Sequence, residues 1–150
     1  MNKLKYWLPA IILMVIIFLA SNDPVSGEKL DFITRFIWNT ISLLTGKPST
    51  PEQEAATTFV IRKLAHVTEY LLLCLSYYYA LRKTFKLENW QKTYFVAFIA
   101  AFFYAVSDEF HQTFIAGRVG TYEDVLIDTV GVCLGYLVIY VYSGSDKYNN

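Results

Sequence analysis

Cysteine and charge are scarce in this sequence, and each scarcity excludes a class of protein. The only cysteines are Cys74 and Cys133, and both sit inside apolar runs, so neither a disulfide framework nor a cysteine zinc site is expected. Charged residues make up 17% of the chain and the formal net charge is zero, so the basic surface needed for nucleic-acid binding is missing. Internal repeats and low-complexity tracts are also absent from the sequence. A length of 150 residues fits a single domain over residues 1–150.

Apolar residues are abundant, at 55% of the chain, and the mean hydropathy of +0.33 is high for a water-soluble protein. Apolar segments predict membrane spans at about residues 5–21, 59–81, 93–112 and 122–142. The sequence therefore predicts an all-α, polytopic membrane protein with a four-helix transmembrane bundle. The first segment is short, but Phe18 occupies a position where signal-peptide cleavage after Ala20 needs a small residue, which favours a retained helix. The polar tail from Ser143 is expected to lack regular structure.

The segment between the first two spans, residues 21–46, has apolar residues at three- and four-residue steps. This pattern predicts an amphipathic, extracytoplasmic helix, either packed on the bundle or lying in the lipid headgroups with Trp38 as an anchor. The sequence GKPSTP then marks a break. Thr50 has the features of an N-cap, with Pro51 at the first helical position and Gln53 completing a capping box.

Lysine and arginine residues in the short flanks predict the orientation of the bundle. Lys3, Lys5, the basic loop at residues 82–92 and Lys147 all fall on one side of the predicted membrane. Both termini are therefore expected in the cytoplasm of a multi-pass protein of the bacterial cell membrane. This orientation places the polar residues of the spans in the outer half of the bilayer.

Ionisable and amide side chains are concentrated in residues 62–69 and 107–131, although charges are costly inside a bilayer and by default mark a functional site. Their helical spacing places Arg62, His66 and Glu69 on one face, Asp108 and Gln112 on another, and Asp124 and Asp128 on a third together with Gly131 and Gly135. The two glycines form a small-xxx-small pair that allows a neighbouring helix to approach closely. We expect one outward-facing pocket with these ligand-binding candidates: Arg62, Lys63, His66, Glu69, Asp108, Glu109, His111, Gln112, Arg118, Asp124 and Asp128.

Acidic residues outnumber basic ones in this set, so the pocket needs protonated acids, cationic histidines, or a bound metal ion or cationic ligand. The candidate ligands for a divalent metal are His66, Glu69, Asp108, Glu109 and Asp128. The candidate catalytic residues are His66, Glu69, Glu109 and His111. The spacing matches no standard metal motif such as H-E-x-x-H, and no nucleophile elbow is present. The sequence therefore identifies no cofactor, and a divalent metal stays one candidate.

The stretches RKLAHVTEY (residues 62–70) and SDEFHQTFIAGRVGTYEDVLIDTVG (residues 107–131) resemble the motifs of the VanZ-like membrane protein family. The resemblance covers about the last three spans and implies a small bacterial integral membrane protein. The family's namesake is linked to antibiotic resistance against the glycopeptide teicoplanin, and relatives to lipoglycopeptides. By position, the family's polar motif residues correspond to the eleven candidates above.

Two functions from different classes remain open at this point. In the first, the pocket binds an envelope lipid headgroup or a lipoglycopeptide and modulates drug susceptibility. In the second, the protein is a membrane-embedded enzyme, metal-dependent or acid/base, that acts on a lipid-linked envelope substrate. A proton or ion pathway ranks last, because the cytoplasmic halves of the predicted spans are almost purely apolar.

Overall fold

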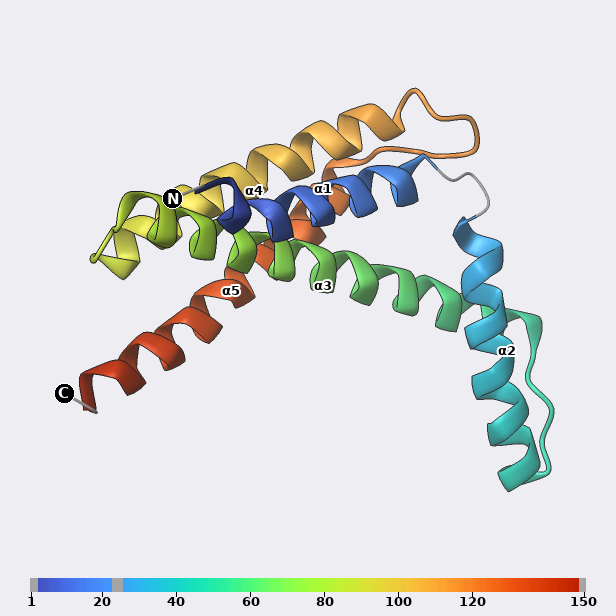
Figure 1. Cartoon of the computed structure of the whole chain (residues 1–150). Helices are drawn as coiled ribbons and strands as arrows, with labels where there is room; N and C mark the ends of the chain where they lie inside the picture. The colour runs from blue at the N-terminus through green and yellow to red at the C-terminus, as the bar shows by residue number, and fades with distance from the viewer. Residues whose placement is uncertain (1–2, 23–25, 149–150) are drawn as a thin grey trace.

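The computed structural model describes residues 3–22 and 26–148, and every regular element in these ranges is helical. A short 3-10 turn, η1 (Lys3–Tyr6), precedes α1 (Leu8–Ser21) and α2 (Ser26–Thr45). The long α3 (Pro51–Phe85), then α4 (Trp90–Gln112) and α5 (Tyr122–Tyr148), complete the chain (Figure 1). The predicted all-α class is confirmed. The prediction of an irregular tail over residues 143–150 is wrong as far as Tyr148, because α5 continues without interruption to that residue. Its last two residues, 149 and 150, lie outside the described part of the chain.

The boundaries of α3 and α4 follow from local chemistry. Thr50 caps α3 by accepting a hydrogen bond from the Gln53 backbone N–H, and the Gln53 side chain accepts one from the Thr50 N–H in return, as the predicted capping box requires. The Thr50 side chain also hydrogen bonds the carboxylate of Glu52 and lowers the pKa of that group. At the other end of α3, Lys86 adopts a left-handed conformation (φ 54°) that stops the helix, and Asn89 then caps α4.

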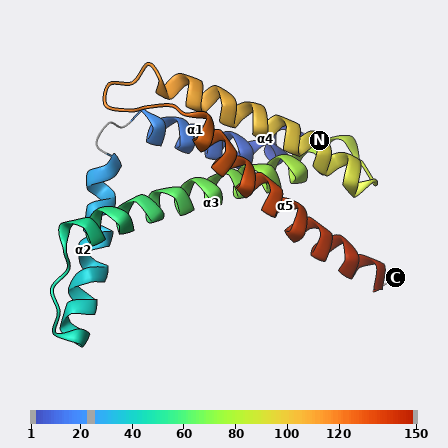
Figure 2. The same ribbon diagram turned by 180° about the vertical axis from the view of Figure 1, so that it is seen from behind.

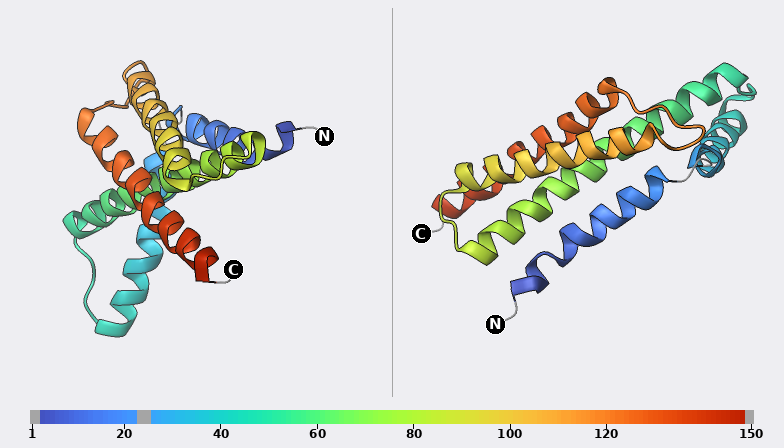
Figure 3. Two further views of the ribbon diagram at one scale, coloured as in Figure 1. Left: turned by 90° about the vertical axis from the view of Figure 1, so that its left-hand side faces the viewer. Right: turned by 90° about the horizontal axis from the view of Figure 1, so that it is seen from above.

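Helix α3 runs through the middle of the molecule, with α1, α4 and α5 packed around it (Figure 3). On α4, Ala97, Ala101 and Ala105 are completely buried at four-residue steps, and this small-residue stripe lets neighbouring helices approach closely. Larger side chains of α3, including the fully buried Tyr70 and Leu73, fill the space between the helices. The core therefore lies along the second half of α3, where the buried residues run from Tyr70 to Leu81.

Helix α1 belongs to this bundle. Its side chains Ala10 and Ile17 are buried in the common core. The Tyr104 hydroxyl of α4 donates to the Met14 carbonyl oxygen over 2.6 Å, and the Trp7 indole N–H donates to the Thr84 hydroxyl of α3 over 2.9 Å. These contacts tie the first apolar segment to both later helices.

Helix α2 lies across one end of the bundle and packs against the first turns of α3 (Figures 1 and 2). Thr34, buried on its inner face, shares a 2.8 Å hydrogen bond with Thr58, and the Trp38 indole N–H donates to the Thr57 hydroxyl over 3.0 Å. Phe32, Phe36 and Leu43 remain exposed. The helix thus docks one polar edge on α3 and leaves large apolar side chains uncovered.

The two ends of the bundle differ in what they carry. The N-terminal turn, the α3–α4 connection and the end of α5 lie at one end, whereas α2 and the α4–α5 connection lie at the other (Figure 1). Helix α4 and residues Tyr122–Ser143 of α5 are long and apolar enough to cross a membrane, and Leu8–Ser21 is a shorter apolar helix. Helix α3 encloses the predicted span at residues 59–81. The spans in α1 and α3 stay predictions.

Candidate functional site

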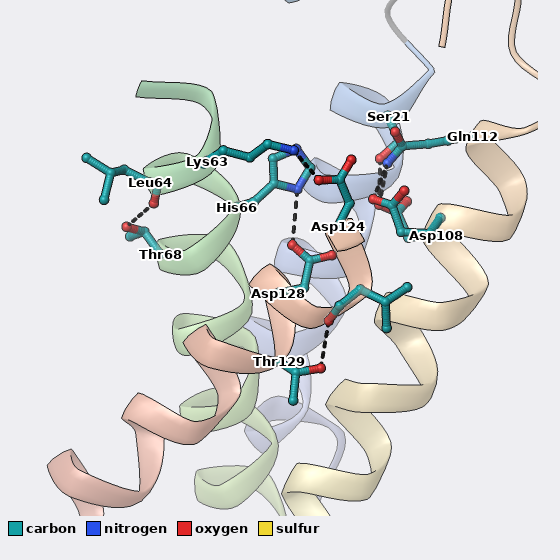
Figure 4. Close-up of polar contacts among 12 residues, drawn as sticks. Ser21, Lys63, Leu64, His66, Thr68, Asp108, Gln112, Asp124, Asp128 and Thr129 are labelled. Atoms are coloured by element: carbon teal, nitrogen blue, oxygen red, sulfur yellow. Dashed lines mark hydrogen bonds and ion pairs between the residues drawn. The ribbon is translucent and has the colours of Figure 1, made fainter. Parts of the chain in front are cut away.

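Polar side chains from α1, α3, α4 and α5 meet near the end of the bundle that carries the α4–α5 connection (Figure 4). We call this group the polar cluster, and its members are Ser21, His66, Asp108, Glu109, Gln112 and Asp128. Asp108, Glu109, Gln112 and Asp128 are each at most 4% exposed. Burial of three carboxyl groups in one place is unusual, because a buried charge is costly unless it is paired.

On α4, the amide of Gln112 holds the cluster together. Its Nε2 donates to Asp108 Oδ2 over 3.1 Å and to Glu109 Oε1 over 3.2 Å. Asp108 Oδ2 also accepts a hydrogen bond from the Ser21 hydroxyl of α1 over 2.9 Å. The steps of three and four residues between these α4 positions place their side chains on one helical face. The prediction that Asp108 and Gln112 share a helical face is therefore confirmed, and the structure adds a direct hydrogen bond between them.

Between α3 and α5, His66 faces Asp128, with 3.3 Å between His66 Nδ1 and Asp128 Oδ1. One turn nearer the end of the bundle, the Lys63 ammonium group forms an ion pair with Asp124 (Figure 4). Gly131 allows these two helices to come together, since a Cβ atom there would lie 2.2 Å from the Val67 carbonyl oxygen. The prediction that the glycine stripe of α5 faces a close neighbour is confirmed, and the neighbour is α3.

The α4–α5 connection at residues 113–121 closes the end of the site. Gly117 has a positive φ of 80°, a conformation that glycine adopts without a steric penalty. A Cβ atom at Gly120 would lie 2.0 Å from the Glu109 carbonyl oxygen, so the connection folds directly onto α4. The Thr121 N–H then donates to Glu109 Oε2 over 3.2 Å, and Arg118 Nη2 donates to the Ala20 carbonyl oxygen over 2.8 Å.

Other predicted site residues occupy different surroundings. Arg62 lines a cavity of about 480 Å³ between α2 and α3, together with Asp31, Arg35 and Glu54. The His111 ring stacks on Phe18 at 5.0 Å between centroids, and its Nε2 lies 3.0 Å from Asn22 Oδ1. Glu69 is half-buried and within electrostatic reach of His66, Asp128 and Asp108. Five of the eleven candidates belong to the polar cluster, Lys63 and Asp124 pair at its rim, and Arg62 lines the α2–α3 cavity. Glu69, His111 and Arg118 lie outside these three groups, in the surroundings described above.

A family model described as VanZ/LLP1 matches residues 6–143, a region that includes every residue of the polar cluster. The chain belongs to the VanZ/LLP1 family. No curated protein and no solved structure matches the chain. Family membership confirms the resemblance drawn from residues 62–70 and 107–131, because both stretches lie inside the matched region.

The VanZ/LLP1 family is a membrane family, so the surrounding medium of this bundle is a lipid bilayer. This explains the many large apolar side chains on the outside of the helices. On α5, for example, Leu126, Val130, Leu137 and Val141 are between 53% and 71% exposed. Such a surface would favour aggregation in water and is suited to contact with acyl chains.

Sequence reasoning missed three groups of this VanZ/LLP1 site. The Ser21 hydroxyl and the Asn22 side chain reach α4 from the end of α1, and the backbone N–H of Thr121 reaches Glu109. Ser21 is polar and ends an apolar run, which was a weak signal. A backbone donor carries no sequence signal at all, since every residue except proline has one.

Three of the five metal candidates come together among the described residues. One ligand atom from each of His66, Glu109 and Asp128 lies within 4.8 Å of the other two. Asp108 is instead bound by Ser21 and Gln112. The arrangement offers one imidazole nitrogen and two carboxylates from three different helices, a donor set capable of proton transfer or of metal coordination.

Proposed function

We propose that this chain is a multi-pass membrane protein that binds the headgroup of an envelope lipid, or a lipoglycopeptide, at the outer side of the membrane and thereby changes susceptibility to glycopeptide antibiotics. The observation that carries the proposal is the buried polar cluster, contributed by α1, α3, α4 and α5 inside a bundle of a membrane family. Intramembrane ionisable residues are rare and mark sites of function.

The proposed topology has four spans, formed by α1, the part of α3 at residues 59–81, α4 and α5, with α2 in the outer interface. Two features support it. The turn η1 and the end of α5 lie with the α3–α4 connection (Figure 1). Arg82 and Lys83 are in the last turn of α3, and Lys86 begins that connection. Positive residues favour the cytoplasmic side. The polar cluster lies toward the opposite end of the bundle and therefore faces outward in this topology.

The topology is tested with single cysteines in a variant that lacks Cys74 and Cys133. A membrane-impermeant maleimide should label the Lys47→Cys variant in intact cells. It should label the Glu88→Cys variant only after the cells are broken open. Labelling at Glu88 in intact cells with none at Lys47 would reverse the proposed orientation.

The cavity between α2 and α3 supports a lipid headgroup as the ligand. Its lining contains the cations Arg35 and Arg62 and the acids Asp31 and Glu54, beside the apolar Phe59. A zwitterionic headgroup presents a phosphate and an amine, which match this mixture of charges. Arginine binds phosphate oxygens in a bidentate manner, so Arg62 and Arg35 are the expected phosphate contacts.

The function is tested by measuring teicoplanin and lipoglycopeptide susceptibility in a bacterial host that expresses the chain. The wild type should shift the inhibitory concentration relative to an empty vector, and His66→Ala should abolish the shift. The matched control is Glu123→Gln, an exposed acid beside the ion-paired Asp124. Membrane abundance is measured by immunoblot for each variant. An unchanged shift in His66→Ala at equal abundance would refute a role for the cluster.

A membrane-embedded enzyme is the second candidate, and the contact between His66 and Asp128 favours it. His66 Nδ1 lies 3.3 Å from Asp128 Oδ1, so an imidazole and a carboxyl group stand side by side as a possible pair for proton transfer. The assay incubates purified protein with lipid extract from the host envelope and searches for a new product by mass spectrometry. A product formed by the wild type and not by His66→Ala would establish catalysis, whereas lipid binding without turnover would leave the binding function.

A further inference from the structure

Asp128 is the most unusual group in the described part of the chain. Its side chain is 0% exposed, and neither of its carboxylate oxygens accepts a hydrogen bond from the described residues. His66 Nδ1 lies at ion-pair distance, 3.3 Å, without hydrogen-bond geometry. Burying a carboxylate costs several kcal/mol unless it is compensated. The buried Asp128 carboxyl group therefore needs either a proton or a cation beyond this single contact.

The nearby protein cations have other partners. The ammonium group of Lys63 is paired with Asp124, and Arg118 donates to the Ala20 carbonyl oxygen. Glu109 adds a second buried carboxylate beside Asp128, at 3% exposure. Two carboxylates and a neutral imidazole sum to two negative charges. A divalent cation among them would neutralise the group.

The distances suit a metal ion. Metal bonds to nitrogen and oxygen are about 2.0–2.2 Å long, so neighbouring ligand atoms in a tetrahedral site lie about 3.4 Å apart. His66 Nδ1 and Asp128 Oδ1 are separated by 3.3 Å, and a Glu109 oxygen lies within 4.8 Å of ligand atoms on both. These residues come from α3, α5 and α4, so one ion would join the three helices.

The surrounding hydrogen bonds hold Glu109 in place for such a role. Gln112 Nε2 donates to Glu109 Oε1 and the Thr121 N–H donates to Glu109 Oε2, each over 3.2 Å. Each carboxylate oxygen has a second lone pair that these bonds leave available. Ligating carboxylates in metalloproteins are commonly fixed by outer hydrogen bonds of this kind. Gln112 is thus a positioning residue for the proposed ligand.

We propose that His66, Glu109 and Asp128 bind one divalent metal ion, with Zn²⁺ the best match to one imidazole and two carboxylates. Three protein ligands leave a coordination position open, the arrangement of reactive rather than purely structural zinc sites. The open position accepts either water or a phosphate or carboxylate oxygen of a ligand. Only the binding of a ligand oxygen rests on the proposed function. Metal binding itself is independent of that function.

The test is metal content of the full-length protein, purified in detergent without chelator and equilibrated with Zn²⁺. Inductively coupled plasma mass spectrometry should find about one zinc per chain in the wild type. Asp128→Asn should lose it, and the matched control Asp124→Asn, an acid one turn away that pairs with Lys63, should retain it. A wild-type protein without bound zinc, or equal content in both variants, would overturn the site.

A second measurement covers the case in which Asp128→Asn fails to fold. Competition with a fluorescent zinc chelator gives the affinity of wild type and of Gln112→Ala, which keeps all three ligands. Loss of an outer partner typically weakens metal binding about 10- to 100-fold, and that loss is expected here. Substitution with Co²⁺ should give visible absorption bands of a low-symmetry site in the wild type. Wild-type affinity in Gln112→Ala together with no Co²⁺ bands would refute the proposal, whatever the susceptibility assay reports.

Discussion

The close approach of α5 to α3 gives the sharpest test of this architecture. A Cβ atom at Gly131 would lie 2.2 Å from the Val67 carbonyl oxygen, whereas ordinary contacts begin at 3.4 Å. Gly131→Ala must therefore move the two helices apart by about 1.2 Å, the difference between these distances. Because the obstacle is backbone rather than a flexible side chain, no rotamer change relieves it.

The expected cost is substantial. Overpacking a well-packed core costs typically about 1–3 kcal/mol, and we expect Gly131→Ala to reach the upper end of that range. Asp128 lies three residues earlier on α5, so the displacement also pulls its carboxylate away from His66. Unfolding in mixed detergent and SDS micelles, followed by circular dichroism, measures the free energy of unfolding directly.

Gly135→Ala is the matched control, one turn further along the same stripe. Its Cβ atom would meet Cys74 Sγ at 3.4 Å, an ordinary contact. Alanine is also the better helix former by up to about 1 kcal/mol, so this variant should be neutral or slightly more stable. If both variants unfold like the wild type, or both lose the same free energy, α3 and α5 do not meet at Gly131 as described.

Three further predictions concern the rim of the site, α2 and the α4–α5 connection. A double-mutant cycle of Lys63→Met with Asp124→Asn should give a coupling free energy of about 0.5–3 kcal/mol in micelle unfolding, and additive effects would exclude the ion pair. Trp38→Phe removes the indole donor to Thr57 and should weaken the docking of α2 on α3 by about 1 kcal/mol. The weaker docking should appear as faster proteolysis at residues 46–50, and an unchanged rate would argue against the contact. Gly120→Ala places a Cβ atom 2.0 Å from a carbonyl oxygen of α4 and should lower both stability and zinc affinity, so wild-type values for both would contradict the described connection.

The sequence alone determined much about this protein. The start of a helix could be predicted where side chains hydrogen bond to the nearby backbone, as in the capping box of Thr50 and Gln53. Helical periodicity placed Asp108 with Gln112 and Asp128 with Gly131, because residues three or four apart share a face. The end of α5 escaped prediction, since a polar composition does not exclude continued helical hydrogen bonding beyond Ser143.

The tertiary structure decided which of these faces meet. Periodicity fixes angles around one helix and says nothing of its neighbour. Only packing brought His66, Glu109 and Asp128 within 4.8 Å of one another, while Arg62 was turned toward α2. The partners of Asp108 and Glu109 include Ser21, 87 residues away, and the backbone of Thr121. Such contacts depend on how closely whole helices approach, and that distance is set by glycines and alanines at the interfaces rather than by the polar residues themselves.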